Sequence, residues 1–399
     1  MSRKCPVGFL LVLALVFHFF LPVQSMGAEP ETFKIANIWP FTGAFGVYGE
    51  DMKRSIELAV ADYGGKVLGK PIELIFLDSQ SNPTAAVQQT VKGIAEGAQF
   101  ITGAFSSSCT LAMMPVAAQR KIPHLSFLST HDDITGAKKT RYTFRTSTAQ
   151  SAENKMIAKY LKDVGAKSVY AVGADYGVIR VNVDLILKDL GSAGIKTYSS
   201  FSPMGTKDFS VIIEKIEKSD ADTVLLMTLG RDEIALIKQL GQKGLNKHLR
   251  MASTLVVPGI CDACYPYSLG IVNTARYDPD FANAINKKWS NEVYEKYGPS
   301  NLLSPDFYDG MLWFLTVIDK TGSWDKEKWI DAFENSQFMT PKGLKVMCAS
   351  DHQARQEGFV GEFFDGKEKK NSYGIPYSKC GFKVTKTYLA NELYPVCEK

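Results

Sequence analysis

Apolar runs alternate with amphipathic segments along most of the chain. Residues 33–38 form an apolar run of strand length, and apolar residues then recur at helical spacing within residues 50–60. Residues 71–77 and 84–96 repeat this order of strand and helix. The alternation predicts a parallel, doubly wound sheet, because parallel strands need a crossover connection that is usually a helix.

The stretch 101–130 predicts a ligand site. It contains an apolar strand, a serine-rich turn, a helix, a second strand and a second hydroxyl-bearing turn. Parallel strands place their carboxyl ends side by side, and open α/β sheets bind ligands in the crevice beyond those ends. We therefore expect the two turns to form half of a small-molecule site. The hydroxyl residues of the two turns are Ser106, Ser107, Ser108, Ser129 and Thr130.

The three consecutive serines allow two interpretations. They precede a predicted helix at residues 110–119, so one of them could be an ordinary N-cap whose hydroxyl accepts a bond from a free backbone N–H. The N–H groups, the hydroxyls and the helix dipole could instead hold a carboxylate. Three serines exceed what one cap requires, and both interpretations stay open.

The alternation of strands and helices restarts after residue 150, which predicts a second lobe. Three longer amphipathic helices follow at residues 279–297, 305–320 and 326–335, and the tail holds two β-like runs at 358–364 and 381–388. The predicted elements of the second lobe are helices at 152–164, 176–190, 208–218 and 232–242, and strands at 168–172, 195–201, 223–227 and 249–253.

The fold class we predict is α/β with two lobes, each a doubly wound, mostly parallel sheet flanked by helices. We assign residues 29–148 and 276–350 to lobe 1, and residues 149–275 and 351–399 to lobe 2. A chain that returns to both lobes late must cross between them several times. Such crossovers act as a hinge.

The N-terminal residues 1–28 have the pattern of a secretory signal peptide. Arg3 and Lys4 precede an apolar run at residues 9–21, and a polar, small-residue exit follows, with cleavage expected after Ser25 or Ala28. A membrane anchor is the alternative, but this 13-residue run, interrupted only by His18, is shorter than the roughly 20 residues that span a bilayer. We expect a mature protein that is soluble outside the cytoplasm.

The charge balance argues against polyanionic partners. Without Arg3 and Lys4 the chain has 44 basic and 42 acidic side chains, a net charge of +2, so neither nucleic acid nor an anionic membrane is expected as a partner.

Six cysteines follow the predicted signal peptide, and an even number in an oxidising compartment suggests disulfides. Cys261 and Cys264 form a CxxC motif that could bridge locally, although the pairing cannot be deduced. A redox motif and half of a zinc site are the functional alternatives. No helix is predicted to begin at Cys261, and no second CxxC or HxxxH follows at finger spacing, so a structural disulfide is favoured.

The chemistry-bearing residues do not assemble a recognisable active site. The sequence lacks GxSxG, HExxH, GxGxxG and the Walker spacing, and the serine cluster has no assignable base. The glycines of the loop 39–49 are instead expected to let this loop present Phe45 and Tyr48 to the cleft. We expect no enzyme activity, no cofactor and no metal.

Short motifs across the mature chain together resemble one family. They include Phe41-Thr-Gly43, residues 103–108, Asp175-Tyr-Gly177 and Asp351-His-Gln353. In order and spacing they resemble the periplasmic solute-binding proteins of branched-chain amino acid ABC importers, typified by the leucine/isoleucine/valine-binding protein. The resemblance implies a type I periplasmic binding fold that closes on a solute and delivers it to membrane permease subunits.

The resemblance also implies which residues contact the ligand. A serine of the serine-rich turn and the pair after the next strand hold the ligand carboxylate in the amino-acid binders, and the second lobe contributes a tyrosine. Tyr48 lies at the rim of the first lobe. The ligand-binding residues implied are Ser107, Ser108, Ser129, Thr130, Tyr48, Tyr176 and Thr254.

Two departures from the family pattern concern the ligand. The glutamate that holds the ligand ammonium is expected after the strand 249–253, where Ser253-Thr-Leu255 contains no acid, and an aromatic position near Leu229 is aliphatic. A desolvated ammonium without a carboxylate partner is costly. An aromatic or aliphatic carboxylic acid without an amino group is therefore an alternative to a leucine-like amino acid.

The predicted function is a periplasmic, monomeric substrate-binding component of an ABC importer. Its expected partners are a small carboxylate or amino acid and the permease subunits. A periplasmic sensory subunit is one alternative, and a secreted enzyme on the same scaffold is another, because fold alone does not determine function.

Overall fold

The computed structural model describes Met1, residues 30–298 and residues 305–397. The predicted signal peptide beyond Met1, with both predicted cleavage points, lies outside the described residues. Within those residues, no helix is long and apolar enough to cross a membrane.

The first sheet has six strands in the order β2-β3-β1-β4-β5-β6. All neighbouring strands are parallel except β2 and β3, as the strand and helix alternation predicts. The strands are β1 (Phe33–Trp39), β2 (Lys66–Val67), β3 (Lys70–Asp78), β4 (Phe100–Gly103), β5 (His124–Ser126) and β6 (Thr143–Arg145). The helices between them are α1 (Gly49–Tyr63), α2 (Pro83–Ala95) and α3 (Ser107–Gln119).

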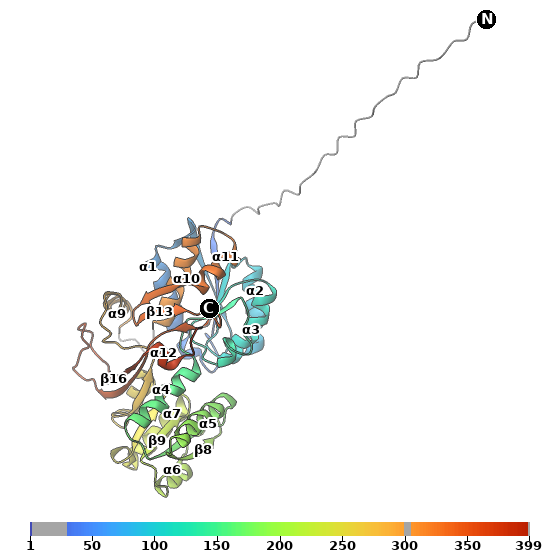
Figure 1. Ribbon diagram of the computed structural model, residues 1–399. Helices are drawn as coiled ribbons and strands as arrows, with labels where there is room; N and C mark the ends of the chain where they lie inside the picture. The colour runs from blue at the N-terminus through green and yellow to red at the C-terminus, as the bar shows by residue number, and fades with distance from the viewer. Residues whose placement is uncertain (2–29, 299–304, 398–399) are drawn as a thin grey trace. The chain divides into compact units, whose positions relative to one another are not determined.

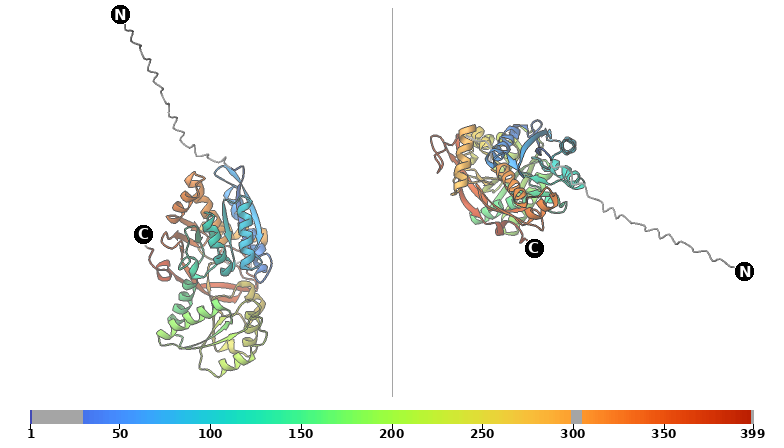
Figure 2. Two further views of the ribbon diagram at one scale, coloured as in Figure 1. Left: turned by 90° about the vertical axis from the view of Figure 1, so that its right-hand side faces the viewer. Right: turned by 90° about the horizontal axis from the view of Figure 1, so that it is seen from above.

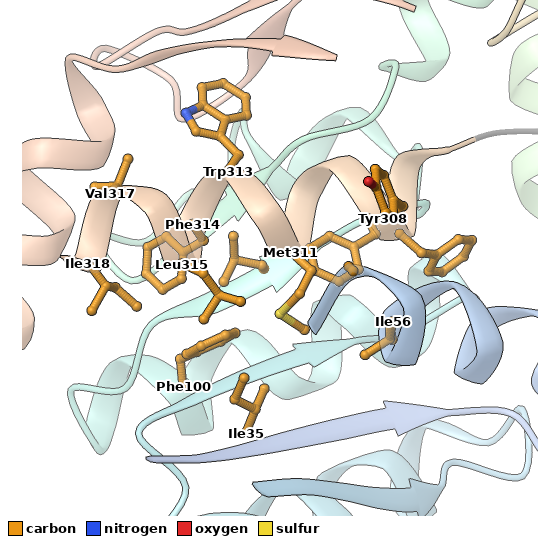
Figure 3. Close-up of a cluster of buried hydrophobic side chains, with 14 of the residues drawn as sticks. Ile35, Ile56, Phe100, Tyr308, Met311, Trp313, Phe314, Leu315, Val317 and Ile318 are labelled. Atoms are coloured by element: carbon orange, nitrogen blue, oxygen red, sulfur yellow. The ribbon is translucent and has the colours of Figure 1, made fainter. Parts of the chain in front are cut away.

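Helix α10 (Asp306–Thr321), far along the chain, completes the core of this first lobe. It packs beside α1, as Figure 1 shows. Figure 3 shows Phe314 and Leu315 pointing from α10 toward Phe100, whose ring meets that of Phe314 edge-on at 5.0 Å. Because most of its sides are covered, α10 is apolar around most of its circumference.

The second sheet has seven strands in the order β16-β15-β11-β10-β9-β7-β8, of which β15 and β16 are antiparallel to their neighbours. Figure 2 (left) shows its green-to-yellow elements gathered apart from the blue first sheet. The strands are β7 (Ser168–Ala174), β8 (Lys196–Ser202), β9 (Thr223–Met227), β10 (Arg250–Ser253), β11 (Val272–Ala275), β15 (Gly358–Asp365) and β16 (Cys380–Tyr388). The helices are α4 (Gln150–Asp163), α5 (Gly177–Ser192), α6 (Ser210–Glu217), α7 (Arg231–Gln242) and α8 (Pro258–Cys264).

The predicted two-lobed α/β class is confirmed, but several short elements were missed. The helix predicted from residue 279 is α9 (Ala284–Tyr297), which begins later because the Asn283 side chain caps it by accepting a bond from Asn286 N at 2.6 Å. Strands of two to five residues carry too little periodicity to be recognised. Besides β2 and β11, the missed strands are β12 (Gln337–Thr340), β13 (Gly343–Met347) and β14 (Ala354–Arg355). The remaining helices are α11 (Lys326–Glu334) and α12 (Ala390–Leu393).

The local CxxC bridge, which the sequence allowed without fixing the pairing, does not form. Residues 261–264 lie in α8 rather than in a loop, and Cys261 pairs with Cys380 on the neighbouring strand β16. Cys348 pairs with Cys397, while Cys264 stays a buried thiol, as does Cys109. Two disulfides therefore tie the C-terminal segment to earlier elements, and the prediction that disulfides form is confirmed.

The chain passes between the two lobes three times, from β6 to α4, from β11 to α9 and from β14, which pairs with β12 and β13 in a small third sheet of the order β12-β13-β14, to β15. Buried polar contacts join these crossovers. The Arg145 guanidinium at the end of β6 donates to the side chain of Gln353, next to β14, and to the carbonyl of His131 at 2.7 Å. The hinge is therefore a connected hydrogen-bonded unit.

An ion pair adds a second tie at the hinge. Arg276, just after β11, lies 2.7 Å from the carboxylate of Glu153 on α4 and donates to the carbonyl of Leu128 in the first lobe at 3.4 Å. The carboxylate of Glu153 also helps to raise the pKa of Arg276, against the lowering effect of burial. One guanidinium thus connects segments of both lobes.

Candidate functional site

The serine-rich turn follows β4 and leads directly into α3. Ser106 occupies the N-cap position but makes no side-chain capping bond, so the ordinary cap interpretation is wrong for its hydroxyl. Its Oγ lies instead 2.9 Å from Oγ of Ser108. These hydroxyls are placed at the positive end of the α3 dipole, where an anion is favoured.

The turn after β5 lies against the serine-rich turn, as the parallel-sheet argument predicted. His131 N donates to Ser107 Oγ at 3.3 Å, which joins the two loops directly. Ser129 is buried, and its hydroxyl donates to the Ala104 carbonyl at 2.7 Å and lies 2.6 Å from Oγ1 of Thr110. The Ser129 hydroxyl therefore holds the loops together through bonds within the protein.

Thr130 points toward the crossover into the second lobe. Its hydroxyl donates to Gln150 Oε1 at 2.9 Å, and Gln150 N donates to the Thr130 carbonyl at 2.8 Å. Gln150 is the first residue of α4. Thr130 thus connects the hydroxyl loops of the first lobe to the start of the second.

An aromatic group stands beside the serine-rich turn. The ring of Tyr48, at the start of α1, stacks on Phe105 with centroids 5.2 Å apart and planes 9° apart. Phe45 meets the same ring at 4.8 Å. Phe105 immediately precedes Ser106, so the loop 39–49 does place Phe45 and Tyr48 beside the hydroxyl groups.

The two second-lobe residues suggested by the family resemblance lie apart from this group. Tyr176 precedes α5 and is 41% exposed, and no contact between it and the serine turns is found among the described residues. Thr254 is buried, and its hydroxyl donates to Sδ of Met227 at 3.5 Å. Among the described residues, no hydrogen bond or ring contact joins either side chain to the hydroxyl loops.

Glu233, in the first turn of α7, is a buried acid that the sequence analysis overlooked. Its side chain is fully buried, and burial raises its pKa to about 8 against the lowering effect of a bond from the Ser253 hydroxyl. Burial raises the pKa of Tyr48, and the negative charge of Glu233 raises it further. The side chain therefore lies near the aromatic group of the first lobe.

The sequence signal for Glu233 was ambiguous. Asp232 and Glu233 together occupy the first turn of a helix, where acidic residues commonly interact with the helix dipole on the surface. Only the packing around α7 shows that this carboxyl is buried.

Two mostly parallel sheets, three crossovers and converging polar loops define a two-lobed α/β solute-binding protein. A family model described as periplasmic binding protein matches residues 32–368. The chain belongs to the periplasmic binding protein family, which confirms the family predicted from the short motifs.

Similar proteins agree with this family. The Leu/Ile/Val-binding protein homolog 6 of Brucella melitensis biotype 1 is 26% identical over 347 residues, covering 83% of this chain and 87% of the relative. The leucine binding protein LivK of Thermotoga maritima is 22% identical with a TM-score of 0.78, covering 91% of this chain and 100% of that one.

A solute binding protein of an ABC transporter from Rhodopseudomonas palustris HaA2, in complex with p-hydroxybenzoic acid, also has a TM-score of 0.78. It is 23% identical, with 90% of this chain and 97% of that chain covered. At this level of identity both solved structures show a shared fold.

Proposed function

We propose that this protein is the periplasmic substrate-binding component of an ABC importer, which takes up an amino acid or related small carboxylate between its lobes and delivers it to membrane permease subunits. The observation that carries the proposal is the junction of the two hydroxyl-bearing loops at the start of α3, where His131 N meets Ser107 Oγ. An anionic group is favoured at that position.

The proposed site divides the ligand between polar and aromatic contacts. Ser107 and Ser108, with the N-terminus of α3, receive the carboxylate, since charge-assisted hydrogen bonds are stronger than neutral ones. Tyr48 and Phe105 offer an aromatic wall to the apolar part of the ligand. Ser129, Thr130, Tyr176 and Thr254 remain in the proposal as residues that position or close the site.

In this proposal, ligand binding shifts the protein from an open to a closed arrangement of the lobes. A ligand that touches both lobes favours the closed state by the difference in its affinity for the two states. Micromolar binding corresponds to roughly 8 kcal/mol, which a few charge-assisted bonds and burial of a small apolar group can supply. The three crossovers supply the hinge, and no catalytic step is required.

A thermal-shift screen of the refolded, ligand-stripped mature protein tests this function. The panel contains amino acids and matched aliphatic and aromatic carboxylic acids, a range that the leucine binding protein of Thermotoga maritima and the p-hydroxybenzoic acid complex of Rhodopseudomonas palustris suggest. A ligand that binds only the folded state raises the melting temperature. The absence of any stabilisation, or chemical turnover of a bound compound, would overturn the proposal.

The partner and assembly are tested separately. Size-exclusion chromatography with light scattering is expected to show a monomer of the mature chain. Membrane vesicles containing the permease that accepts this protein are expected to import the stabilising ligand only when the protein is added. A protein that binds ligand but supports no uptake by any importer would favour the sensory alternative.

A further inference from the structure

The carboxyl group of Glu233 is buried, and one of its two oxygens has no hydrogen-bond partner in the part of the chain that the structure describes. Oε1 accepts a bond from the Ser253 hydroxyl at 3.2 Å, whereas Oε2 has no hydrogen-bond partner among the described residues. No salt bridge to Glu233 occurs within that part of the chain either. A buried carboxyl that lacks both a cation and a second hydrogen bond is costly, so its presence calls for an explanation.

Glu233 also lies at the edge of the second sheet where the carboxyl ends of β9 and β10 meet. It follows the carboxyl end of β9 by way of the loop 228–230, and its partner Ser253 is the last residue of β10. Thr228, in that loop, is fully buried, and its hydroxyl likewise has no partner among the described residues. The carboxyl ends of neighbouring parallel strands are where α/β sheets bind ligands.

Tyr48 is the titratable group of the first lobe that interacts with Glu233. Burial raises the pKa of Tyr48, and the charge of Glu233 raises it further. On the core side, burial raises the pKa of the Cys264 thiol, the charge of Lys238 lowers it, and the charge of Glu233 raises it. Glu233 therefore lies between the second-lobe core and the aromatic group that borders the serine-rich turn. The ring of Tyr48 links the two positions, because it stacks on Phe105 next to Ser106.

We propose that Glu233 receives the protonated amino group of the ligand while the hydroxyl loops of the first lobe receive its carboxylate, so that the protein selects α-amino acids. This rests on the proposed function and names its substrate class. The ligand ammonium supplies the positive charge and the hydrogen-bond donor that Oε2 lacks. A carboxylic acid without the amino group leaves Glu233 as it is in the ligand-free protein.

The test compares matched ligands by isothermal titration calorimetry on the mature protein. The pairs are leucine with 4-methylpentanoate and phenylalanine with 3-phenylpropanoate, and 2-hydroxy-4-methylpentanoate serves as the hydroxyl counterpart. The wild-type protein is expected to bind one of the amino acids at least about 10-fold more tightly than its partner without the amino group, as for a hydrogen bond between charged groups.

The variants are Glu233→Gln and, as a matched control, Glu214→Gln at an exposed position of α6. Glu233→Gln keeps the shape of the side chain and is expected to weaken the amino acid about 10- to 100-fold while leaving the des-amino acid within about 2-fold. Glu214→Gln is expected to change neither. Equal weakening of both ligands by Glu233→Gln, or no weakening, would overturn the inference.

Proton release gives an independent readout that a structural role would not produce. Because burial raises the pKa of Glu233 to about 8, an ammonium that ionises this carboxyl at pH 7 releases close to one proton. Titration in buffers of different ionisation enthalpy measures that release, which is expected to disappear in Glu233→Gln.

The outcomes separate this inference from the function on which it rests. Tight binding of the des-amino acids or of the hydroxy acid in preference to amino acids would overturn the role of Glu233 and leave the carboxylate receptor intact. Binding of no member of any pair, extended to the other amino acids and their des-amino counterparts, would overturn both.

Discussion

At the scale of single residues, buried charge is concentrated near the hinge and behind the proposed site. Lys345 on β13 is fully buried, and its ammonium lies 2.8 Å from a carboxylate oxygen of Asp306 and 2.8 Å from one of Asp309. It also donates to the Thr146 carbonyl at 2.8 Å, in the first crossover. Breaking such a group by removing one partner is more costly than the net stability the group provides.

Lys345→Met is therefore expected to destabilise the fold by about 3–5 kcal/mol, because it leaves two buried carboxyls without this ammonium. Burial already raises the pKa of Asp309 to about 6, against the lowering effect of Lys345. Urea denaturation measures the change, with Lys215→Met at an exposed position of α6 as the control. A loss below about 1 kcal/mol would contradict the structural role assigned to the cluster.

Glu233 predicts a pH dependence of stability. Its pKa is raised by burial from 4.5 to about 8, so between these values the folded state binds more protons than the unfolded state. Its contribution to stability is therefore fully present below pH 4.5 and is lost as the pH rises through 8.

The Glu233→Gln variant has no such titration. The free energy of unfolding of the variant, relative to that of the wild type, is therefore expected to rise between pH 5 and pH 8.5. Denaturant unfolding of both proteins without ligand, at these two pH values, measures the difference. A constant difference across this range would show that the carboxyl titrates near its ordinary pKa.

At the scale of elements, close packing of α10 against the first sheet sets a sharp limit on side-chain size. A Cβ built on Gly310 would lie 2.6 Å from the Phe127 ring and 2.7 Å from Oγ1 of Thr146. Phe127 follows β5 and Thr146 follows β6. The missing side chain at residue 310 therefore lets α10 approach the segments that lead into the proposed site and the hinge.

Gly310→Ala is expected to destabilise the protein by about 1–3 kcal/mol through overpacking, despite the better helix propensity of alanine. Gly191→Ala in α5 is the matched control, because a Cβ there has nothing within 4 Å. That variant is expected to stabilise by about 0.4–1 kcal/mol. Thermal unfolding of the two variants should give shifts of opposite sign, and shifts of the same sign would contradict the packing argument.

At the scale of the whole molecule, the proposed function depends on coupling ligand contacts in both lobes to the three crossovers. The contacts of Arg276 with Glu153 and with the Leu128 carbonyl join the lobes at one of these crossovers. A hinge of this kind can guide closure without unfolding either lobe.

Ligand binding is therefore expected to reduce the radius of gyration of the mature protein in small-angle X-ray scattering. At a ligand concentration of 100 times Kd, the free energy of unfolding is expected to rise by about 2.7 kcal/mol. An unchanged scattering curve at saturation would mean that closure does not accompany binding.

The sequence by itself determined the order of the main strands and helices and the class of fold. Periodicity was sufficient because long amphipathic helices and apolar strands carry a repeating signal, as in α1 and β3. The same reasoning predicted that the loops after β4 and β5 meet, and the contact between Ser107 and His131 follows from that topology. The assignment of lobe boundaries and of ligand-binding residues stays a prediction.

Tertiary structure alone decided which cysteines pair and which acid is buried. Cys261 meets Cys380 because α8 packs beside β16, a contact between positions 119 residues apart that no local pattern encodes. Glu233 resembles any surface acid at a helix start until α7 folds over the second sheet and removes it from water. Burial and long-range pairing depend on packing between distant segments, whereas periodicity reports only on neighbours along the chain.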